Sequence, residues 1–496
     1  MRESGILLPI SSLPSQYGIG CFSKEAYEFV DQLALANQKY WQILPLGPTS
    51  YGDSPYQSFS TYAGNPYFID LNTLIEEGVL TKKECNLADF GSDSRFIDYG
   101  KLYKARYKLL RKAYERSNIS QNPEFQTFQE ENAWWLDDYS LFMAVKGFFQ
   151  DECWDKWPED IKKRYGYALD YYREPLYFEI EFQKYMQFEF SIQWKKLKTY
   201  ADENGIRIIG DIPIYVAYDS ADTWAHPELF QLDEENVPLA VAGCPPDGFA
   251  ADGQLWGNPL YRWDYHRRTG YTWWMQRLSY AFYLYDVVRI DHFRGFDEYF
   301  SIPYGDTTAR NGHWEKGPGI ELFHRMKEVL GERDVIAEDL GYVTDSVRQM
   351  VLESGFPGMK VFEFAFDSRD TGCAGDYLPH NYPVNSVVYT GTHDNATLIG
   401  WYQDIPKESR EMLRDYIHDY TTSDRSLHWS VICRVMGSPA RICMIPMQDY
   451  LGLNNTCRIN TPSTLGTNWK WRLLDGEFTS DLQNKIKKLV RIYQRN

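Results

Sequence analysis

The sequence has few of the features that mark nucleic-acid-binding, membrane-spanning or zinc-binding proteins. No stretch approaches the roughly 20 apolar residues that a membrane-spanning helix needs. The 69 Asp and Glu residues outnumber the 52 Lys and Arg residues, which gives a net charge of −17. This balance argues against a nucleic-acid partner or an anionic membrane, because both require a basic face. None of the eight cysteines forms a Cys-x-x-Cys pair, so zinc-ribbon and thioredoxin chemistry are not predicted.

The sequence also lacks a secretory pattern and the common nucleotide motifs. The first apolar run, from Ile6, is short and ends at Pro9. A cytoplasmic protein with buried thiols is therefore expected. Neither a phosphate-binding loop nor a Gly-x-Ser-x-Gly motif occurs, and Gly18-Ile19-Gly20 lacks the third glycine of a dinucleotide site. Nucleotide hydrolysis, esterase chemistry and a nucleotide cofactor are thus disfavoured.

Aromatic residues, in contrast, are abundant. The chain of 496 residues has 16 Trp, 38 Tyr and 27 Phe, while its 43% apolar and 24% charged residues are typical of a globular protein. A large core would explain the aromatic content. Stacking platforms for a ligand with apolar faces, such as a sugar, would explain it as well.

Short apolar runs recur along the chain and predict eight strands. Most are nearly continuous rather than alternating, which is typical of parallel strands covered on both faces. Helical patterns lie between several of them, beginning for example after Ser23 and Thr344. This alternation favours a (β/α)8 barrel, the TIM barrel of the α/β class, over an open doubly wound sheet. The predicted strands are residues 6–10, 41–46, 206–216, 287–293, 335–340, 359–366, 386–392 and 442–447.

The uneven strand spacing predicts large insertions. Charged, aromatic, helix-forming sequence fills the long gap after the second strand, so a helical subdomain is expected over about residues 60–200. A segment richer in Gly and Pro, residues 218–285, is expected to form an active-site subdomain and loop. We expect one elaborated catalytic barrel over residues 1–496, with no separate C-terminal β-sandwich.

Acidic residues follow three of the predicted strands. Asp291, Glu338 and Asp394 each stand where catalytic groups of such barrels lie, at the C-terminal end of a strand. A lone Asp there is usually a loop cap, but three at corresponding positions favour a common site. Arg289 shares a strand face with Asp291, and its charge would favour the ionised carboxylate.

Two carboxyl groups of opposite protonation are what glycosidic-bond cleavage requires. The ionised group attacks the anomeric carbon, and the protonated group delivers a proton to the leaving oxygen. Apolar residues precede Glu338, and burial among them would raise the pKa of its carboxyl, as suits the acid. A third carboxylate can hold sugar hydroxyls more tightly as the ring flattens.

Nine segments together give the chain a resemblance to a known family. They occur in the order that is typical of that family. The sequence resembles a 4-α-glucanotransferase of the amylomaltase (disproportionating enzyme) type, which is glycoside hydrolase family 77 of the α-amylase clan. The segments are residues 5–14 (GILLPISSLP), 51–57 (YGDSPYQ), 64–66 (GNP), 210–213 (GDIP), 256–259 (WGNP), 289–295 (RIDHFRG), 337–341 (AEDLG), 392–395 (THDN) and 468–469 (NW).

The resemblance implies a retaining transfer of α-1,4-glucan segments to the 4-hydroxyl of another glucan or of glucose, without a cofactor. It makes Asp291 the nucleophile, Glu338 the general acid/base and Asp394 the transition-state stabiliser. It also implies that sugar-binding residues surround these three. They are Arg289 and His393 in the −1 subsite, Asp211 as a brace, Tyr56 and Trp256 as aromatic platforms, and Tyr51, Asp367 and Asn468 as further matching positions.

Two further features bear on specificity and metal binding. Residues 248–252 (GFAAD) are smaller and more acidic than the family pattern, which puts the preferred chain length in doubt. His292 and His393 each adjoin an Asp but show no His-Glu-x-x-His spacing, so a metal is not predicted. A plain α-1,4-glucan hydrolase with the same carboxylates is the nearer alternative, and a non-catalytic glycan-binding protein is the farther one.

Overall fold

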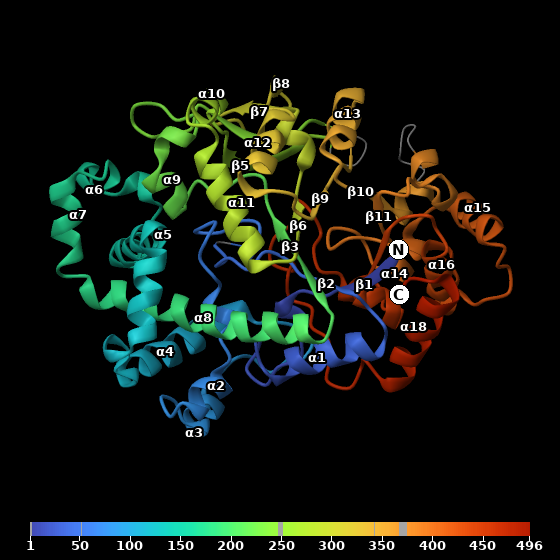
Figure 1. Cartoon of the computed structure of the whole chain (residues 1–496), viewed down its shortest axis with the longest axis horizontal. Helices are drawn as coiled ribbons and strands as arrows, with labels where there is room; N and C mark the ends of the chain where they lie inside the picture. Colours follow the sequence, from blue (N-terminus) through green and yellow to red (C-terminus); the bar gives the residue numbers. More distant parts are fainter. Residues whose placement is uncertain (1, 51, 247–250, 342, 367–373) are drawn as a thin grey trace.

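A closed parallel barrel forms the centre of the molecule (Figure 1). The computed structural model describes residues 2–50, 52–246, 251–341, 343–366 and 374–496. In this part of the chain eight strands pair in the order β1-β12-β11-β10-β9-β6-β3-β2, which confirms the predicted (β/α)8 fold. The barrel strands are β1 (Glu3–Leu7), β2 (Tyr40–Gln42), β3 (Arg207–Ile212), β6 (Val287–Ile290), β9 (Val335–Ala337), β10 (Gly358–Val361), β11 (Ser386–Tyr389) and β12 (Ile442–Pro446).

Each barrel strand overlaps one predicted strand, but several boundaries differ. The first strand lies three residues earlier than predicted, because Pro9 follows it and Ile10–Ser12 forms a 3₁₀ turn. The third ends at Ile212, before Pro213, which has no N–H for the ladder. Short strands that end early leave the residues after them free to form the loops at the barrel mouth.

A second, antiparallel sheet was not predicted from the sequence. It has the order β5-β4-β7-β8 and consists of β4 (Ala240–Cys244), β5 (Gln254–Pro259), β7 (Glu298–Pro303) and β8 (His313–Lys316). Its small core contains Val241, Phe300 and Ile302. The strands β4 and β5 precede β6 in the chain, whereas β7 and β8 follow it. The subdomain that was predicted over residues 218–285 therefore also includes residues after 285.

Helices fill the long interval between β2 and β3. The long helices α5 (Pro123–Phe148) and α8 (Tyr177–Glu203) pack against each other, and α1 (Lys24–Leu35) packs along α8 (Figure 1). A second apolar cluster lies among these helices and includes Trp135 and Tyr139, whereas Trp134 is half-exposed. The helices of the interval are α2 (Leu71–Glu76), α3 (Lys82–Leu87), α4 (Tyr99–Ser117), α5 (Pro123–Phe148), α6 (Glu159–Lys162), α7 (Gly166–Arg173) and α8 (Tyr177–Glu203).

The remaining helices surround the barrel, and the two chain ends meet beside it. Arg2 donates to the Ser438 carbonyl at 2.8 Å, and Arg495 donates to the Glu3 carbonyl at 3.2 Å. These helices are α1 (Lys24–Leu35), α9 (Ala221–Ala225), α10 (Trp263–Arg268), α11 (Thr272–Leu284), α12 (Glu321–Leu330), α13 (Asp345–Ser354), α14 (Leu398–Asp404), α15 (Lys407–Ile417), α16 (Leu427–Met436), α17 (Met447–Leu451) and α18 (Ser480–Tyr493). In the described ranges, none of the helices has the length and apolarity to cross a bilayer.

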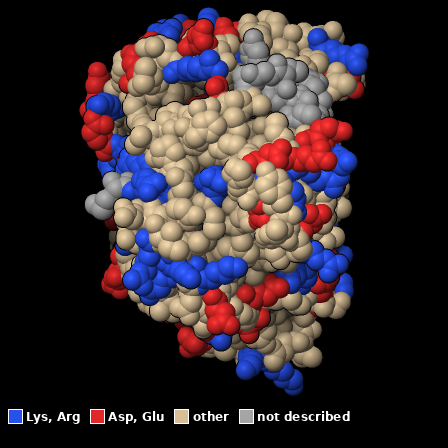
Figure 2. All heavy atoms as spheres, turned by 90° about the vertical axis from the view of Figure 1, so that its right-hand side faces the viewer, with Lys and Arg blue, Asp and Glu red and all other residues tan. Residues whose placement is uncertain are grey.

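Charge is mixed on the face formed by the C-terminal helices. Figure 2 shows bands of Lys and Arg side chains there, interrupted by Asp and Glu. The net charge of −17 therefore does not produce a uniformly acidic surface on this face.

Gly210 on β3 is a point of close packing. A Cβ atom at this position would lie 2.1 Å from the ring of Tyr285, which precedes β6. We expect Gly210→Ala to lower the free energy of unfolding by about 1–3 kcal/mol, because the ring or the strand must move. Thermal unfolding measures the effect. Gly147 in α5, where a Cβ would meet nothing within 4 Å, is the control. Gly147→Ala should be neutral or stabilising by up to about 1 kcal/mol, and equal losses at both positions would contradict the packing argument.

Candidate active site

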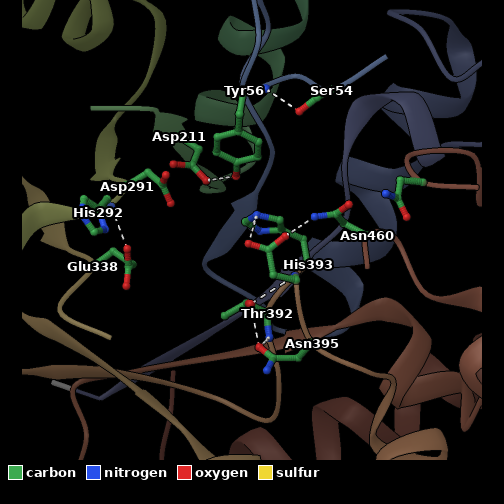
Figure 3. A network of polar contacts seen from close by, with 12 residues as sticks. Ser54, Tyr56, Asp211, Asp291, His292, Glu338, Thr392, His393, Asn395 and Asn460 are labelled. Atoms are coloured by element: carbon green, nitrogen blue, oxygen red, sulfur yellow. Dashed lines mark hydrogen bonds and ion pairs between the residues drawn. The ribbon is translucent and has the colours of Figure 1, made fainter. Parts of the chain in front are cut away.

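Three strand ends bring the predicted carboxylates to the C-terminal mouth of the barrel. Asp291 follows β6, Glu338 follows β9, and Asp394 lies on the loop between β11 and α14. Figure 3 shows the Asp291 and Glu338 side chains adjacent to each other, with His393, the residue before Asp394, in the same network of polar contacts. The structure therefore brings together the residues that the sequence placed at three separate strand ends.

A buried arginine joins two acidic residues at the base of this site. Arg289 Nη1 lies 2.7 and 2.6 Å from the two carboxylate oxygens of Asp211 and 3.1 Å from Asp291 Oδ1. The register of β3 and β6 places Asp211 directly beside Arg289. The Tyr56 hydroxyl donates to Asp211 Oδ2 at 2.6 Å. Asp211 therefore contacts both Arg289 and Tyr56.

The pKa of the Asp291 carboxyl is raised to about 6. Burial raises it most; Arg289 lowers it, and the neighbouring charges of Asp211 and Asp394 raise it again. The sequence expectation that Arg289 would hold this carboxyl ionised is thus only partly fulfilled. The main reason is burial, and Asp211 also takes the two shorter contacts with the guanidinium.

Glu338 is held by backbone amides rather than by a cation. Its Oε2 accepts from the His292 N–H at 2.7 Å and its Oε1 from the Leu340 N–H at 2.9 Å. Burial, followed by the charge of Asp291, raises the pKa of this carboxyl to about 8. The two carboxyl groups titrate as a pair, and Asp291 loses its proton first. One ionised and one protonated carboxyl then stand side by side near neutral pH.

Asp394 has the opposite electrostatic environment. His393 Nε2 lies 3.3 Å from Asp394 Oδ2, and Asn460 Nδ2 donates to Oδ1 at 2.6 Å. Burial raises the pKa of this carboxyl, but His393 and Asn460 lower it to about 2 overall. Asp394 therefore stays ionised. Asn460 was missed in the sequence, because no local motif connects a loop residue to an Asp that is 66 positions earlier.

Two aromatic side chains flank the carboxylates. The Tyr56 ring stacks on His393 with centroids 5.2 Å apart and planes at 15°. The half-buried Trp256 meets His292 edge-on at 4.9 Å. His292 has a left-handed backbone, with φ of 52°, and its pKa is lowered to about 3 by burial and by Arg294. His292 is therefore neutral, and Tyr56 and Trp256 each contact a histidine that follows or precedes one of the carboxylates in the chain.

The other predicted positions have different surroundings. Asn468 donates to the Thr464 carbonyl at 2.9 Å and accepts from the Thr461 N–H at 3.0 Å, so it braces its own loop. Tyr51 and Asp367 lie outside the described residues, as do residues 248–250 of the unusual loop. Asp252 in that loop is exposed and pairs with Arg310 at 2.6 Å. Within the described chain, no group of three His, Cys, Asp or Glu side chains is arranged to hold a metal ion.

Comparisons with known proteins agree on one family. A family model described as 4-alpha-glucanotransferase matches residues 8–477. A 4-alpha-glucanotransferase of Clostridium butyricum is 50% identical over 488 residues, which cover 98% of this chain and 99% of that protein. One of Streptococcus pneumoniae is 47% identical over 498 residues, covering 100% and 97% of the two chains. The solved structure of amylomaltase from Streptococcus agalactiae in complex with acarbose aligns with a TM-score of 0.96 and 40% identity, with all of both chains covered.

The raised pKa of Glu338 makes a prediction about stability. The folded protein keeps the Glu338 proton up to about pH 8, whereas the unfolded chain releases it at about pH 4.3. The stability that this proton contributes is complete below the unfolded pKa and is lost as the pH rises through the folded one. Glu338→Gln, which is always neutral, should therefore unfold at a higher temperature than the parent at pH 8.5, by about 1–3 °C.

Calorimetry at pH 4.5 and pH 8.5 measures this difference. The gain should shrink toward pH 4.5, where the parent carboxyl is also neutral in the folded state. Glu131→Gln on an exposed position of α5 controls for the exchange itself. A gain of equal size at both pH values would show that Glu338 is not held protonated by its surroundings.

Proposed function

The chain belongs to the 4-alpha-glucanotransferase family and is an enzyme with that activity, and we propose that it works by retaining double displacement at Asp291 and Glu338. The observation that carries this mechanism is the opposite protonation of the two adjacent carboxyl groups, with pKa values of about 6 and about 8. A nucleophile must be ionised and a general acid must be protonated at the same pH.

In the first step, a carboxylate oxygen of Asp291 attacks the anomeric carbon of a glucose unit in an α-1,4-glucan. The bond from that carbon to the glycosidic oxygen breaks, and the proton of Glu338 moves to this oxygen. The products are a β-glucosyl ester on Asp291 and a fragment with a free 4-hydroxyl. Arg289, 3.1 Å from Asp291 Oδ1, orients the attacking carboxylate.

In the second step, the 4-hydroxyl of another glucan or of glucose attacks the same carbon. Glu338, now ionised, takes the hydroxyl proton, and the bond to Asp291 breaks. Two inversions retain the α configuration. Asp394, ionised beside His393, holds sugar hydroxyls more tightly when the ring flattens and carries positive charge, which stabilises the transition state of both steps.

Aromatic surfaces support transfer to a sugar rather than to water. Tyr56 and Trp256 flank the carboxylates, and aromatic faces suit the C–H faces of glucose. A bound acceptor has a high effective concentration and displaces water from the intermediate. The solved amylomaltase from Streptococcus agalactiae is in complex with acarbose, which supports the proposal that this chain also binds oligosaccharides. The proposed substrates are malto-oligosaccharides, amylose and soluble dextrins, with glucose as an acceptor.

We also propose a single elaborated barrel in the cytoplasm. The helical subdomain is the interval around α2–α8, and the active-site subdomain is built on residues 218–285 with the antiparallel sheet. In the chain, β4 and β5 lie between the barrel strands β3 and β6, which supports an inserted active-site subdomain. After β12 the described chain contains the helices α17 and α18 and one short 3₁₀ segment between them.

The product pattern from maltotriose tests the reaction. A transferase gives glucose and longer oligosaccharides with little change in reducing ends, whereas a hydrolase increases reducing ends steadily. We expect the first pattern from the parent and a loss of at least about 10³-fold in kcat from Asp291→Asn, because the ester cannot form. Chromatography of products with a reducing-end assay measures both. A fully active Asp291→Asn variant would remove the assignment of the nucleophile.

The pH profile tests the assignment of acid and nucleophile. The reaction needs Asp291 ionised and Glu338 protonated in the free enzyme, so kcat/KM for maltotriose should fall below about pH 6 and again above about pH 8. The two limbs report the coupled pair rather than single residues. Unfolding followed over the same pH range is the control. A profile that stays flat up to pH 10 would contradict the role of Glu338 as the acid.

A further inference from the structure

One buried carboxylate outside the mouth holds both ends of the loop that carries Asp394. The loop begins at Thr390, directly after β11, and ends at Leu398, the first residue of α14. The Thr390 hydroxyl donates to Asp449 Oδ2 at 2.5 Å, and the Leu398 N–H donates to Asp449 Oδ1 at 2.7 Å. Asp449 lies on α17, which follows β12, the strand paired with β11. A single side chain therefore fixes the separation of the two loop ends.

The same stretch of chain holds the loop at three levels. At the base, Asp449 binds Thr390 and Leu398. Further along, Asn455 Oδ1 accepts from the Thr397 N–H at 3.1 Å. At the tip, Asn460 donates to Asp394 Oδ1 at 2.6 Å. Residues 449–460 thus form a continuous support under the loop, and Asp449 is the member farthest from the mouth.

Stability alone does not account for an acidic residue at this position. Asp449 is 1% exposed and Thr390 is fully buried. Its carboxylate makes no ion pair within the described chain, and its partners are neutral donors, so burial raises its pKa to about 6. Burying a carboxylate without a cation is costly, and an apolar side chain would avoid that cost. What an apolar side chain cannot do is accept two hydrogen bonds from opposite ends of a loop.

We propose that Asp449 and Thr390 are positioning residues that set the location of Asp394 through the ends of its loop. This inference rests on the proposed role of Asp394 as the transition-state stabiliser. Neither residue touches the substrate; they act on the reaction only through the loop. Since a small misplacement of a catalytic group can cost about 100-fold in rate, the clamp affects turnover more than substrate binding.

Isosteric substitutions test the clamp. Thr390→Val removes one donor, and Asp449→Asn replaces one of the two acceptor oxygens with an amide nitrogen. We expect both to lower kcat for maltotriose disproportionation by about 10- to 100-fold with KM within about twofold of the parent. Thr390→Ser restores the hydroxyl and should recover most of the rate. If Asp449→Asn does not fold, Thr390→Val and Thr390→Ser decide the question.

A buried threonine elsewhere provides the matched control. The Thr223 hydroxyl on α9 is fully buried and donates to the Ala217 carbonyl at 3.0 Å. Thr223→Val should lower the unfolding temperature as much as Thr390→Val does but leave kcat unchanged. Equal kcat for Thr390→Val, Asp449→Asn and the parent would overturn the inference. So would an equal fall in kcat in Thr223→Val.

The variant Asp394→Asn separates this inference from the proposed function. Its loss of turnover, together with normal kcat in the clamp variants, would reject the clamp and leave the mechanism intact. Full activity of Asp394→Asn would instead reject the proposed role of Asp394 itself, and the inference would fall with it.

Discussion

The division of one guanidinium between two carboxylates is the interaction on which the site depends. Arg289 is buried and must be paired, and Asp211 pairs with it through both oxygens at 2.6 and 2.7 Å. The contact with Asp291 is longer, at 3.1 Å, so the cation lowers the pKa of Asp291 only in part. The negative charge of Asp211 also raises the pKa of Asp291, although burial raises it more. Asp211 therefore acts on the pKa of Asp291 in two ways, because it shares the guanidinium and because its own charge raises that pKa.

This division follows from the register of the barrel. Asp211 and Arg289 are partners in the ladder between β3 and β6, and Ile290 is the partner of Ala337, the residue before Glu338. A slip of one residue between these strands would turn one side chain of each pair to the other face of the sheet. Gly210, packed against the Tyr285 ring, lets β3 lie close enough to keep that register. The acid–base chemistry of the mouth is thus fixed by backbone hydrogen bonds several residues below it.

The sequence predicted what depends on local pattern and missed what depends on distant contacts. Apolar runs revealed the eight barrel strands, and acidic residues after β6, β9 and β11 revealed the carboxylates. Thr344 caps α13 through the Val347 N–H, as expected, whereas Ser23 precedes α1 but donates to Glu25 instead. The strands β7 and β8 have no periodicity that distinguishes them from loops. The support by Asn460 and Asp449 could not be predicted either, because their partners lie more than fifty residues away in the chain. The domain boundaries remain a proposal.

The three carboxylates differ in function because they differ in donors, not in depth. Burial raises the pKa of all three. Asp394 accepts a hydrogen bond from an amide, contacts a histidine and stays ionised. Asp291 contacts an arginine that it shares with Asp211, and it ionises near pH 6. Glu338 accepts hydrogen bonds from two backbone amides, lies beside the anionic Asp291 and keeps its proton to about pH 8. The two backbone amides fix where Glu338 lies; they lower the pKa of its carboxyl, but less than burial and the charge of Asp291 raise it. A side-chain cation at the same distance would fix the carboxyl equally well but would remove the proton that the leaving oxygen needs. The absence of a lysine or arginine contact with Glu338 among the described residues is, on this argument, as necessary to the chemistry as the presence of Arg289 beside Asp291.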